Sequence, residues 1–244
     1  MALAAHRLQP EQKVRPVLKA LDQRYGAKRR GGSADPLAVL IRGVLSQNTS
    51  DVNSGRAYAS LMQRCGGWDG IARAQEREIA CAVRTGGLAA QKAATIKSIM
   101  RWLVRKDGYS LDFLRRLDDR QVEAELTAIK GVGVKTARLV LLFGFGRPVF
   151  VVDTHVLRVS RRLGLIPHSC GRDRAHVLLD ALVPDERKYS GHLNMIEHGR
   201  RTCRARSPAC PGCPVRRWCL HVRGEAGSPQ PSGARLRRGA SGSS

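Results

Sequence analysis

The chain has 244 residues, 42% of them hydrophobic but only 5% aromatic, so aliphatic side chains must build its core. Lys and Arg number 43 against 20 Asp and Glu, and a formal net charge of +23 favours a polyanionic partner, above all nucleic acid. No apolar run has the length of a transmembrane helix and the N-terminus lacks a signal-type segment, so we expect a soluble, intracellular protein without membrane contact.

Apolar residues recur with a helical period almost throughout the chain. Asp35 and Pro36 are typical of a helix start, and a polar run at 46–50 separates that helix from the next. The expected helices cover about 11–24, 37–45, 51–62, 76–84, 89–105, 119–128, 134–144, 154–163, 172–182 and 186–199. Residues 148–152, PVFVV, resemble a strand but are too short and isolated to found a sheet. The sequence therefore predicts an all-α protein.

Residues 129–136 read IKGVGVKT and connect two expected helices. Glycine takes the positive φ that a tight helix-hairpin-helix turn needs, and Gly131 and Gly133 fit such a turn. Exposed amides there, together with the N-terminus of the next helix at Val134, are suited to bind a DNA phosphate. Such a contact does not depend on the DNA sequence. The hairpin therefore predicts backbone binding. On this interpretation alone, Lys135 is a further phosphate contact.

Lys135 stands at the wrong end of a helix for a cation, because the helix dipole is positive there. The dipole and partial burial both lower the pKa of a lysine, which yields a neutral amine that can act as a nucleophile. Asp153, in VVDTH, ends an apolar run and precedes another helix, where its carboxylate stays ionised. A neutral amine beside a fixed anion suits attack at a sugar C1′. Asp153 is also a candidate N-cap of that helix; a structural cap is the alternative to a catalytic role, and the two roles are compatible.

Seven cysteines in an intracellular protein argue against a disulfide framework, and four of them are closely spaced. They have the spacing C-x6-C-x2-C-x5-C and are Cys203, Cys210, Cys213 and Cys219. Four thiolates in so short a segment can hold one compact metal cluster. A single structural zinc ion is the alternative, but a zinc site usually has two short ligand pairs and only Cys210 and Cys213 form one. Arg204 and Arg206 lie between the first two ligands, which indicates a phosphate-binding loop.

Taken together, the motifs LSQNTSD, GGLAAQKA, IKGVGVKTA, VVDTHVLR and HGRRTCRARSPACPGCPVRRWC make the chain resemble the endonuclease III family of helix-hairpin-helix DNA glycosylases. The resemblance implies two helical domains with the active site in the cleft between them. A six-helix barrel domain with the hairpin covers 37–146. An iron–sulfur cluster domain joins 1–36 to 147–222 and holds one [4Fe-4S] cluster on the four cysteines, and 223–244 form a disordered basic tail.

The same resemblance implies an activity. Lys135 resembles the Schiff-base lysine of the family and Asp153 its assisting aspartate. Members excise oxidised or damaged pyrimidines from double-stranded DNA and then cleave the strand at the abasic site by β-elimination. We therefore expect a bifunctional glycosylase and abasic-site lyase that acts as a monomer on DNA in the cytoplasm.

Two stretches are candidates for filling the gap that a flipped base leaves in the duplex. In LSQNTSD, Asn48 stands where the family usually has glutamine, with Gln47 just before it. In GGLAAQKA, Leu88 follows two glycines and matches a leucine that wedges beside the gap. His155 is expected to pack in the first turn of its helix near the site, with proton transfer as the alternative.

Two other functions stay open at this point. A monofunctional relative, such as an adenine or thymine mismatch glycosylase, is disfavoured because such enzymes generally lack the lysine found at Lys135. A non-catalytic DNA-binding iron–sulfur protein would make the combination of Lys135 and Asp153 a coincidence. The motifs do not select one damaged base among the pyrimidine lesions.

Overall fold

The computed structural model describes residues 8–224 apart from residues 33 and 107, and within this part the chain forms helices and no β-strand. The α-helices are α1 Pro10–Tyr25, α2 Pro36–Leu45, α3 Asp51–Cys65, α4 Trp68–Arg73, α5 Glu76–Ala82, α6 Ala89–Val104, α7 Asp119–Thr127, α8 Val134–Leu139, α9 Thr154–Leu163, α10 Arg172–Leu182 and α11 Asp185–Arg201. The all-α prediction is confirmed. The predicted tail lies outside the described residues, apart from Arg223 and Gly224.

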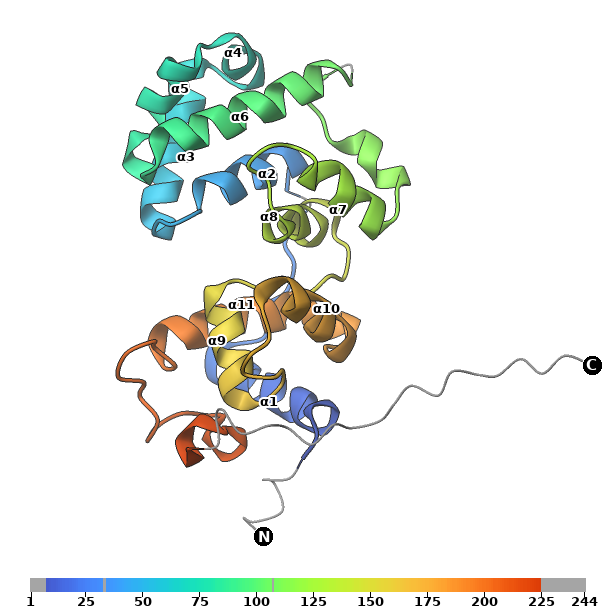
Figure 1. Ribbon diagram of the computed structural model, residues 1–244, viewed down its shortest axis with the longest axis vertical. Coiled ribbons are helices and arrows are strands. Elements are labelled where there is room, and N and C mark those ends of the chain that lie inside the picture. Colours follow the sequence, from blue (N-terminus) through green and yellow to red (C-terminus); the bar gives the residue numbers. More distant parts are fainter. Residues whose placement is uncertain (1–7, 33, 107, 225–244) are drawn as a thin grey trace, which may run out of the picture.

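The helices form two groups (Figure 1). Helices α2 to α8 lie together in the upper part of the view, and α1 lies below with α9, α10 and α11. The N-terminal helix α1 contacts α11 and α10, so the two ends of the described chain share one core. Each group has its own hydrophobic cluster. The domain boundaries that the resemblance implies stay a prediction.

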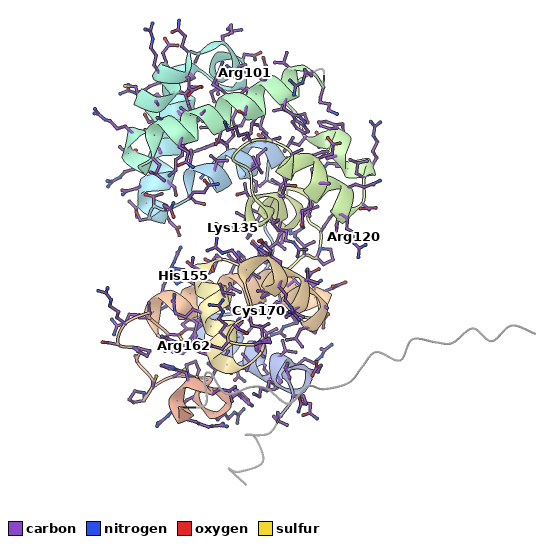
Figure 2. The ribbon with its side chains drawn as sticks, in the orientation of Figure 1. Arg101, Arg120, Lys135, His155, Arg162 and Cys170 are labelled. Carbon is purple, nitrogen blue, oxygen red and sulfur yellow. The ribbon has the colours of Figure 1, made fainter. Side chains whose placement is uncertain are left out.

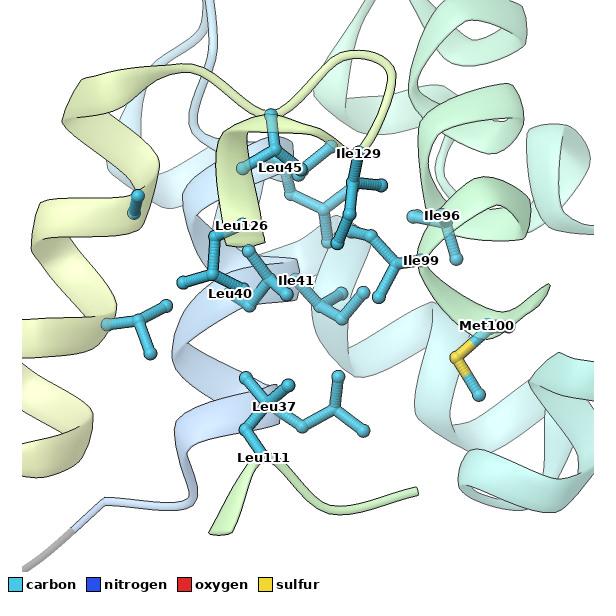
Figure 3. Packing of buried hydrophobic residues seen from close by; sticks show 14 of the residues in the cluster. Leu37, Leu40, Ile41, Leu45, Ile96, Ile99, Met100, Leu111, Leu126 and Ile129 are labelled. Atoms are coloured by element: carbon cyan, nitrogen blue, oxygen red, sulfur yellow. The ribbon is translucent and has the colours of Figure 1, made fainter. Parts of the chain in front are cut away.

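Aliphatic side chains build the larger cluster, as the composition predicts (Figure 3). Helix α2 runs through its centre and buries Leu37, Leu40 and Ile41 completely. Ile96 and Ile99 of α6 belong to the same cluster and are equally buried. Each such side chain contributes about 1.5–3 kcal/mol relative to an exposed one. This core holds the hairpin between α7 and α8 in place, because Ile129 and Val132 of the hairpin also belong to it.

The segment 147–153 forms neither helix nor strand in the described structure, and successive side chains alternate between the two groups. Val149 and Val151 belong to the hydrophobic cluster of α2 to α8, whereas Phe150 and Val152 belong to that of α1 and α9 to α11. This alternation fixes the segment between the two groups and sets the position of Asp153, its last residue.

Some local features differ from the prediction. Helix α4, Trp68–Arg73, was not expected, because six residues are too few to show a helical repeat in the sequence. The helix expected over 134–144 is α-helical only to Leu139 and continues as a π-helix, Val140–Phe145. Apolar periodicity does not separate these two helical forms over so few residues. In the described part of the chain, no helix combines the length and the apolar character that crossing a membrane requires.

Candidate active site

The hairpin between α7 and α8 confirms one of the two glycine predictions. Gly131 has φ +91°, and a Cβ there would lie 2.1 Å from Thr95 Oγ1, so the turn needs glycine. Gly133 instead has an ordinary extended backbone, with φ −104°, and is the N-cap of α8. A Cβ on Gly133 would meet no atom within 4 Å. The fold therefore does not require glycine at 133, and the hairpin is open to an approaching molecule at this point.

Lys135 is the second residue of α8, directly after Val134, and it is half-buried. Burial lowers the pKa of its ammonium, and the charges of Arg172 and Arg200 lower it further. The carboxylates of Asp153 and Asp51 act in the opposite direction but do not cancel the effect of burial. At a given pH, a larger fraction of Lys135 is therefore in the neutral amine form than of a free lysine. In Figure 2, Lys135 lies where the upper group of helices faces the lower one.

Asp153 reaches the same place from the other group of helices. Its Oδ1 accepts a hydrogen bond from the backbone amide of Val156 at 2.7 Å, so Asp153 is the N-cap of α9. The N-cap that the sequence predicts is confirmed. The charge of Asp153 raises the pKa of Lys135, so the two predicted residues lie within electrostatic reach of each other. Their catalytic roles stay predictions.

Side chains of α10 and α11 hold the backbone that leads to Asp153. The amide of Phe150 donates to Asp180 Oδ1 at 2.5 Å, and the Val152 amide lies 3.3 Å from His176 Nδ1. Burial lowers the pKa of His176 to about 4, so the ring is neutral at physiological pH. Sequence reasoning missed these partners, because no local pattern marks them.

His192 of α11 is another residue that the sequence did not indicate. Its Nδ1 donates to the carbonyl of Val151 at 2.9 Å, and burial lowers its pKa to about 4. The charges of Asp153 and Lys135 both act on its ring. A neutral imidazole therefore lines the buried side of the site.

His155 lies in the first turn of α9, near the boundary between the two groups (Figure 2). Its Nδ1 lies 3.0 Å from Nη2 of Arg158, which also donates to Gly199 O at 2.9 Å. Burial lowers the pKa of His155. These contacts match the predicted packing role and tie α9 to the end of α11.

The candidate gap-filling loops both contain a residue with unusual backbone geometry. Asn48 has φ 52° and Leu88 has φ 49°, which are left-handed values that side chains disfavour. The side chain of Leu88 is exposed. Gln47 Nε2 donates to Gly131 O at 3.4 Å, so the loop at 46–50 lies against the hairpin. Backbone strain of this kind is typical of functional sites.

The four closely spaced cysteines line a single pocket, together with His198 and Arg162. Burial, with a smaller contribution from the other three thiols nearby, raises the pKa of the Cys213 thiol to about 11. In the described part of the chain, no three His, Cys, Asp or Glu side chains converge on one ion position. A single zinc needs ligand sulfurs about 2.3 Å from one point, whereas a [4Fe-4S] cluster distributes four thiolates over four irons. Four thiol groups that line one pocket fit such a cluster, because it is held by four cysteine sulfurs.

The loop between the first two of these cysteines carries both predicted phosphate contacts. Arg204 and Arg206 are exposed on it. Arg162 of α9 donates to Arg204 O at 2.8 Å and lies 3.3 Å from Cys203 Sγ. Helix α9, whose N-cap is Asp153, therefore also holds the cysteine loop.

Comparison with known proteins agrees with this geometry. Residues 41–184, more than half of the chain, match the HhH-GPD superfamily of base excision DNA repair proteins. Endonuclease III of Thermotoga maritima is 35% identical over 189 residues, which are 78% of this chain and 84% of the relative. A candidate DNA glycosylase of Arabidopsis thaliana is 40% identical over 162 residues, 66% of this chain but only 55% of the plant protein.

A solved structure of a trapped covalent intermediate of endonuclease III with DNA has the same fold. It aligns with a TM-score of 0.75 at 28% identity and covers 88% of this chain and 97% of that one. With the hairpin, Lys135 and Asp153 in one site, these matches place the chain in the endonuclease III family of the HhH-GPD superfamily of base excision DNA repair proteins.

Proposed function

We propose that the chain is a base excision repair DNA glycosylase that removes damaged pyrimidines from duplex DNA and then cleaves the strand as an abasic-site lyase. The observation that carries this proposal is the half-buried Lys135. Burial lowers its pKa even though the nearby Asp153 carboxylate raises it. A lysine amine that loses its proton easily is a nucleophile, and a carboxylate stabilises a developing cation. Both groups are fixed at helix N-termini.

Base excision uses these two groups in turn. As the N-glycosidic bond breaks, its electron pair leaves with the base and positive charge develops on the sugar. The Asp153 carboxylate stabilises that charge. The Lys135 amine forms a bond to C1′ and loses a proton, and ring opening then gives a Schiff base between Nζ and C1′.

Strand cleavage follows from the Schiff base. The iminium acidifies the C2′ hydrogen, and its removal drives β-elimination, in which the C3′–O bond breaks and the 3′ phosphate leaves. Water then hydrolyses the Schiff base and regenerates the Lys135 amine. These steps involve no net oxidation or reduction, so they need no redox group.

DNA contacts are assigned by exposure and geometry. The open amides at Gly131 and Gly133 and the exposed Arg204 and Arg206 would bind phosphates of damaged or abasic duplex DNA. Exposed Leu88 would enter the duplex beside the extruded nucleotide, with Asn48 and Gln47 on the other candidate loop. The enzyme would act as a monomer on DNA in the cell interior.

We assign one [4Fe-4S] cluster to Cys203, Cys210, Cys213 and Cys219. When bound, the cluster would take the four cysteine thiolates as ligands and so cross-link the cysteine loop, and it would supply this structural support rather than a chemical step. Its effect on DNA would pass through Arg204 and Arg206, which this loop displays.

The test is a set of duplexes that each carry one damaged pyrimidine, thymine glycol among them, together with one duplex that carries an adenine mismatch. All are assayed for released base and for strand nicks with and without alkali. We expect both base release and nicking without alkali. Base release with nicks only after alkali would indicate a monofunctional glycosylase. Binding without either product would indicate a non-catalytic DNA-binding protein. Release of undamaged adenine from a mismatch, in place of the damaged pyrimidine, would overturn the substrate assignment.

A further inference from the structure

Lys92 of α6 is a buried cation outside the chemistry described above. Its side chain is 2% exposed and is among the largest fully buried side chains in the described structure. Its Nζ donates to Leu45 O at 2.8 Å and to Gly86 O at 2.7 Å. No ion pair joins it to a carboxylate in the part of the chain that the structure describes. Burying an ammonium costs free energy, so these carbonyls must compensate for the loss of water.

Both carbonyls belong to helix ends. Leu45 is the last residue of α2, and Gly86 is the last residue of the 3-10 helix Arg84–Gly86. Carbonyls at a helix C-terminus have no partner within the helix and attract a cation. An apolar side chain in place of Lys92 would fill the space but leave both carbonyls unsatisfied. The ammonium therefore ties one helix end to the other.

Each of these helix ends leads directly into a candidate gap-filling loop. Leu45 precedes the loop 46–50 with Asn48, and Gly86 precedes Gly87 and Leu88. The backbone amide of Lys92 also donates to Leu88 O at 2.9 Å. Asn48 and Leu88 are two of only three non-glycine residues with positive φ among the described residues. Such a backbone persists only where its surroundings fix it, and Lys92 contacts the residues that lead into both loops.

We propose that Lys92 is a positioning residue that locks the loop 46–50 and the turn at Gly87 and Leu88 together, so that Asn48 and Leu88 enter the duplex as one rigid unit. The inference rests on the proposed glycosylase function. Lys92 acts through these loops and does not touch the reacting atoms. Its contribution is therefore to extrusion of the damaged nucleotide, and not to the chemistry at Lys135.

The same helix provides a matched control. Lys97 Nζ also donates to two backbone carbonyls, Ala72 O at 2.6 Å and Ala74 O at 2.7 Å. These carbonyls lie at the end of α4, which leads into neither candidate gap-filling loop. Lys97→Met therefore removes a comparable tie from α6 without releasing either loop.

The experiment compares Lys92→Met and Lys97→Met with the full-length parent. Single-turnover excision is measured on a thymine glycol duplex that carries 2-aminopurine next to the lesion, whose fluorescence reports unstacking. Nicking of a duplex with a preformed abasic site is measured in parallel, because extrusion costs less without a base. We expect Lys92→Met to slow excision and the fluorescence rise by at least about tenfold, as small misplacements at active sites do. Nicking of the abasic duplex should change much less.

A double mutant separates positioning from a general loss of structure. If Lys92 acts through Leu88, then Lys92→Met should add little to the defect of Leu88→Ala, whereas independent effects would multiply. Lys92→Gln, which keeps an N–H donor, serves if Lys92→Met does not fold. Thermal denaturation checks that the variants are folded at the assay temperature.

The inference is overturned if Lys92→Met slows excision no more than Lys97→Met, or if its defect multiplies fully with that of Leu88→Ala. Failure of the proposed function looks different, because the parent protein itself would then release no base and nick no abasic duplex.

Discussion

Asp51 and Arg200 form a two-bond ion pair that joins the first turn of α3 to the last turn of α11, with Oδ2 to Nη1 at 2.6 Å and Oδ1 to Nη2 at 3.0 Å. The Arg200 side chain is 46% exposed and that of Asp51 is 66% exposed, so the pair contributes only about 0–1 kcal/mol to folding. Its charges nevertheless act on Lys135, and they act in opposite directions. The pair thus connects the two groups of helices. Because its two charges are opposite, the pair adds little net charge to the site.

Opposite charges predict opposite pH effects. Schiff-base formation needs the neutral amine, so its rate rises with pH and levels off above the pKa of Lys135. Asp51→Asn removes a charge that raises this pKa, and the midpoint should move to lower pH. Arg200→Gln removes a charge that lowers it, and the midpoint should move to higher pH. The trapping rate on saturating abasic DNA, measured against pH, checks both. Shifts in the same direction would contradict the electrostatic picture.

Asp153→Asn tests the charge of Asp153 separately from its structural role. Asparagine caps a helix as well as aspartate does, so the hydrogen bond to the Val156 amide should survive. The negative charge that stabilises the developing cation is lost, and excision should fall by about a hundredfold or more, as for other preorganised electrostatic groups. The melting temperature should change little. Cleavage of a preformed abasic site should persist at a reduced rate, and full excision activity would show that Asp153 is only an N-cap.

The two hairpin glycines should respond differently to valine. Gly133→Val places its side chain in open space on an ordinary backbone, so the protein should fold normally. Duplex binding should weaken equally for all sequences, because the hairpin contacts only the DNA backbone. Gly131→Val instead meets Thr95 and an unfavourable φ, and should destabilise the fold. Filter binding over several salt concentrations, alongside thermal denaturation, measures both effects. Unchanged binding by Gly133→Val would remove the hairpin from the DNA interface.

The cluster assignment predicts a metal content. Protein purified without oxygen should be yellow-brown and contain about four irons per chain. Cys213→Ser removes one of the four thiols that line the pocket, and should lower solubility and iron content before it affects any chemical step. Cys81→Ser, at an exposed cysteine far along the chain from the pocket, is the control. Colourless protein with one zinc per chain would contradict the assignment.

Local sequence patterns predicted the elements that carry the site. The two glycines marked the hairpin, and the polar residue after an apolar run marked Asp153 as an N-cap, because both features depend on neighbouring residues. The burial of Lys135 was also expected, and this burial is the leading cause of its lowered pKa. Short-range rules were sufficient for these features.

The residues that sequence reasoning missed pair over long distances along the chain. His192 binds the carbonyl of Val151, 41 residues away, and Lys92 binds that of Leu45, 47 residues away. Polar side chains within helices look like solvent-exposed positions in a sequence. Only the packing of the helices shows that these are buried and that they hold the backbone around the site.

The central claim is that Lys135 forms the Schiff base. Sodium borohydride reduction of the protein on abasic DNA, followed by protease digestion and mass spectrometry, identifies the attached residue directly. We predict that the DNA adduct is found on Lys135, and that Lys135→Gln gives neither adduct nor strand nick while it still binds abasic DNA. An adduct on another amine, or undiminished trapping by Lys135→Gln, would contradict the claim and leave Lys135 as a phosphate contact.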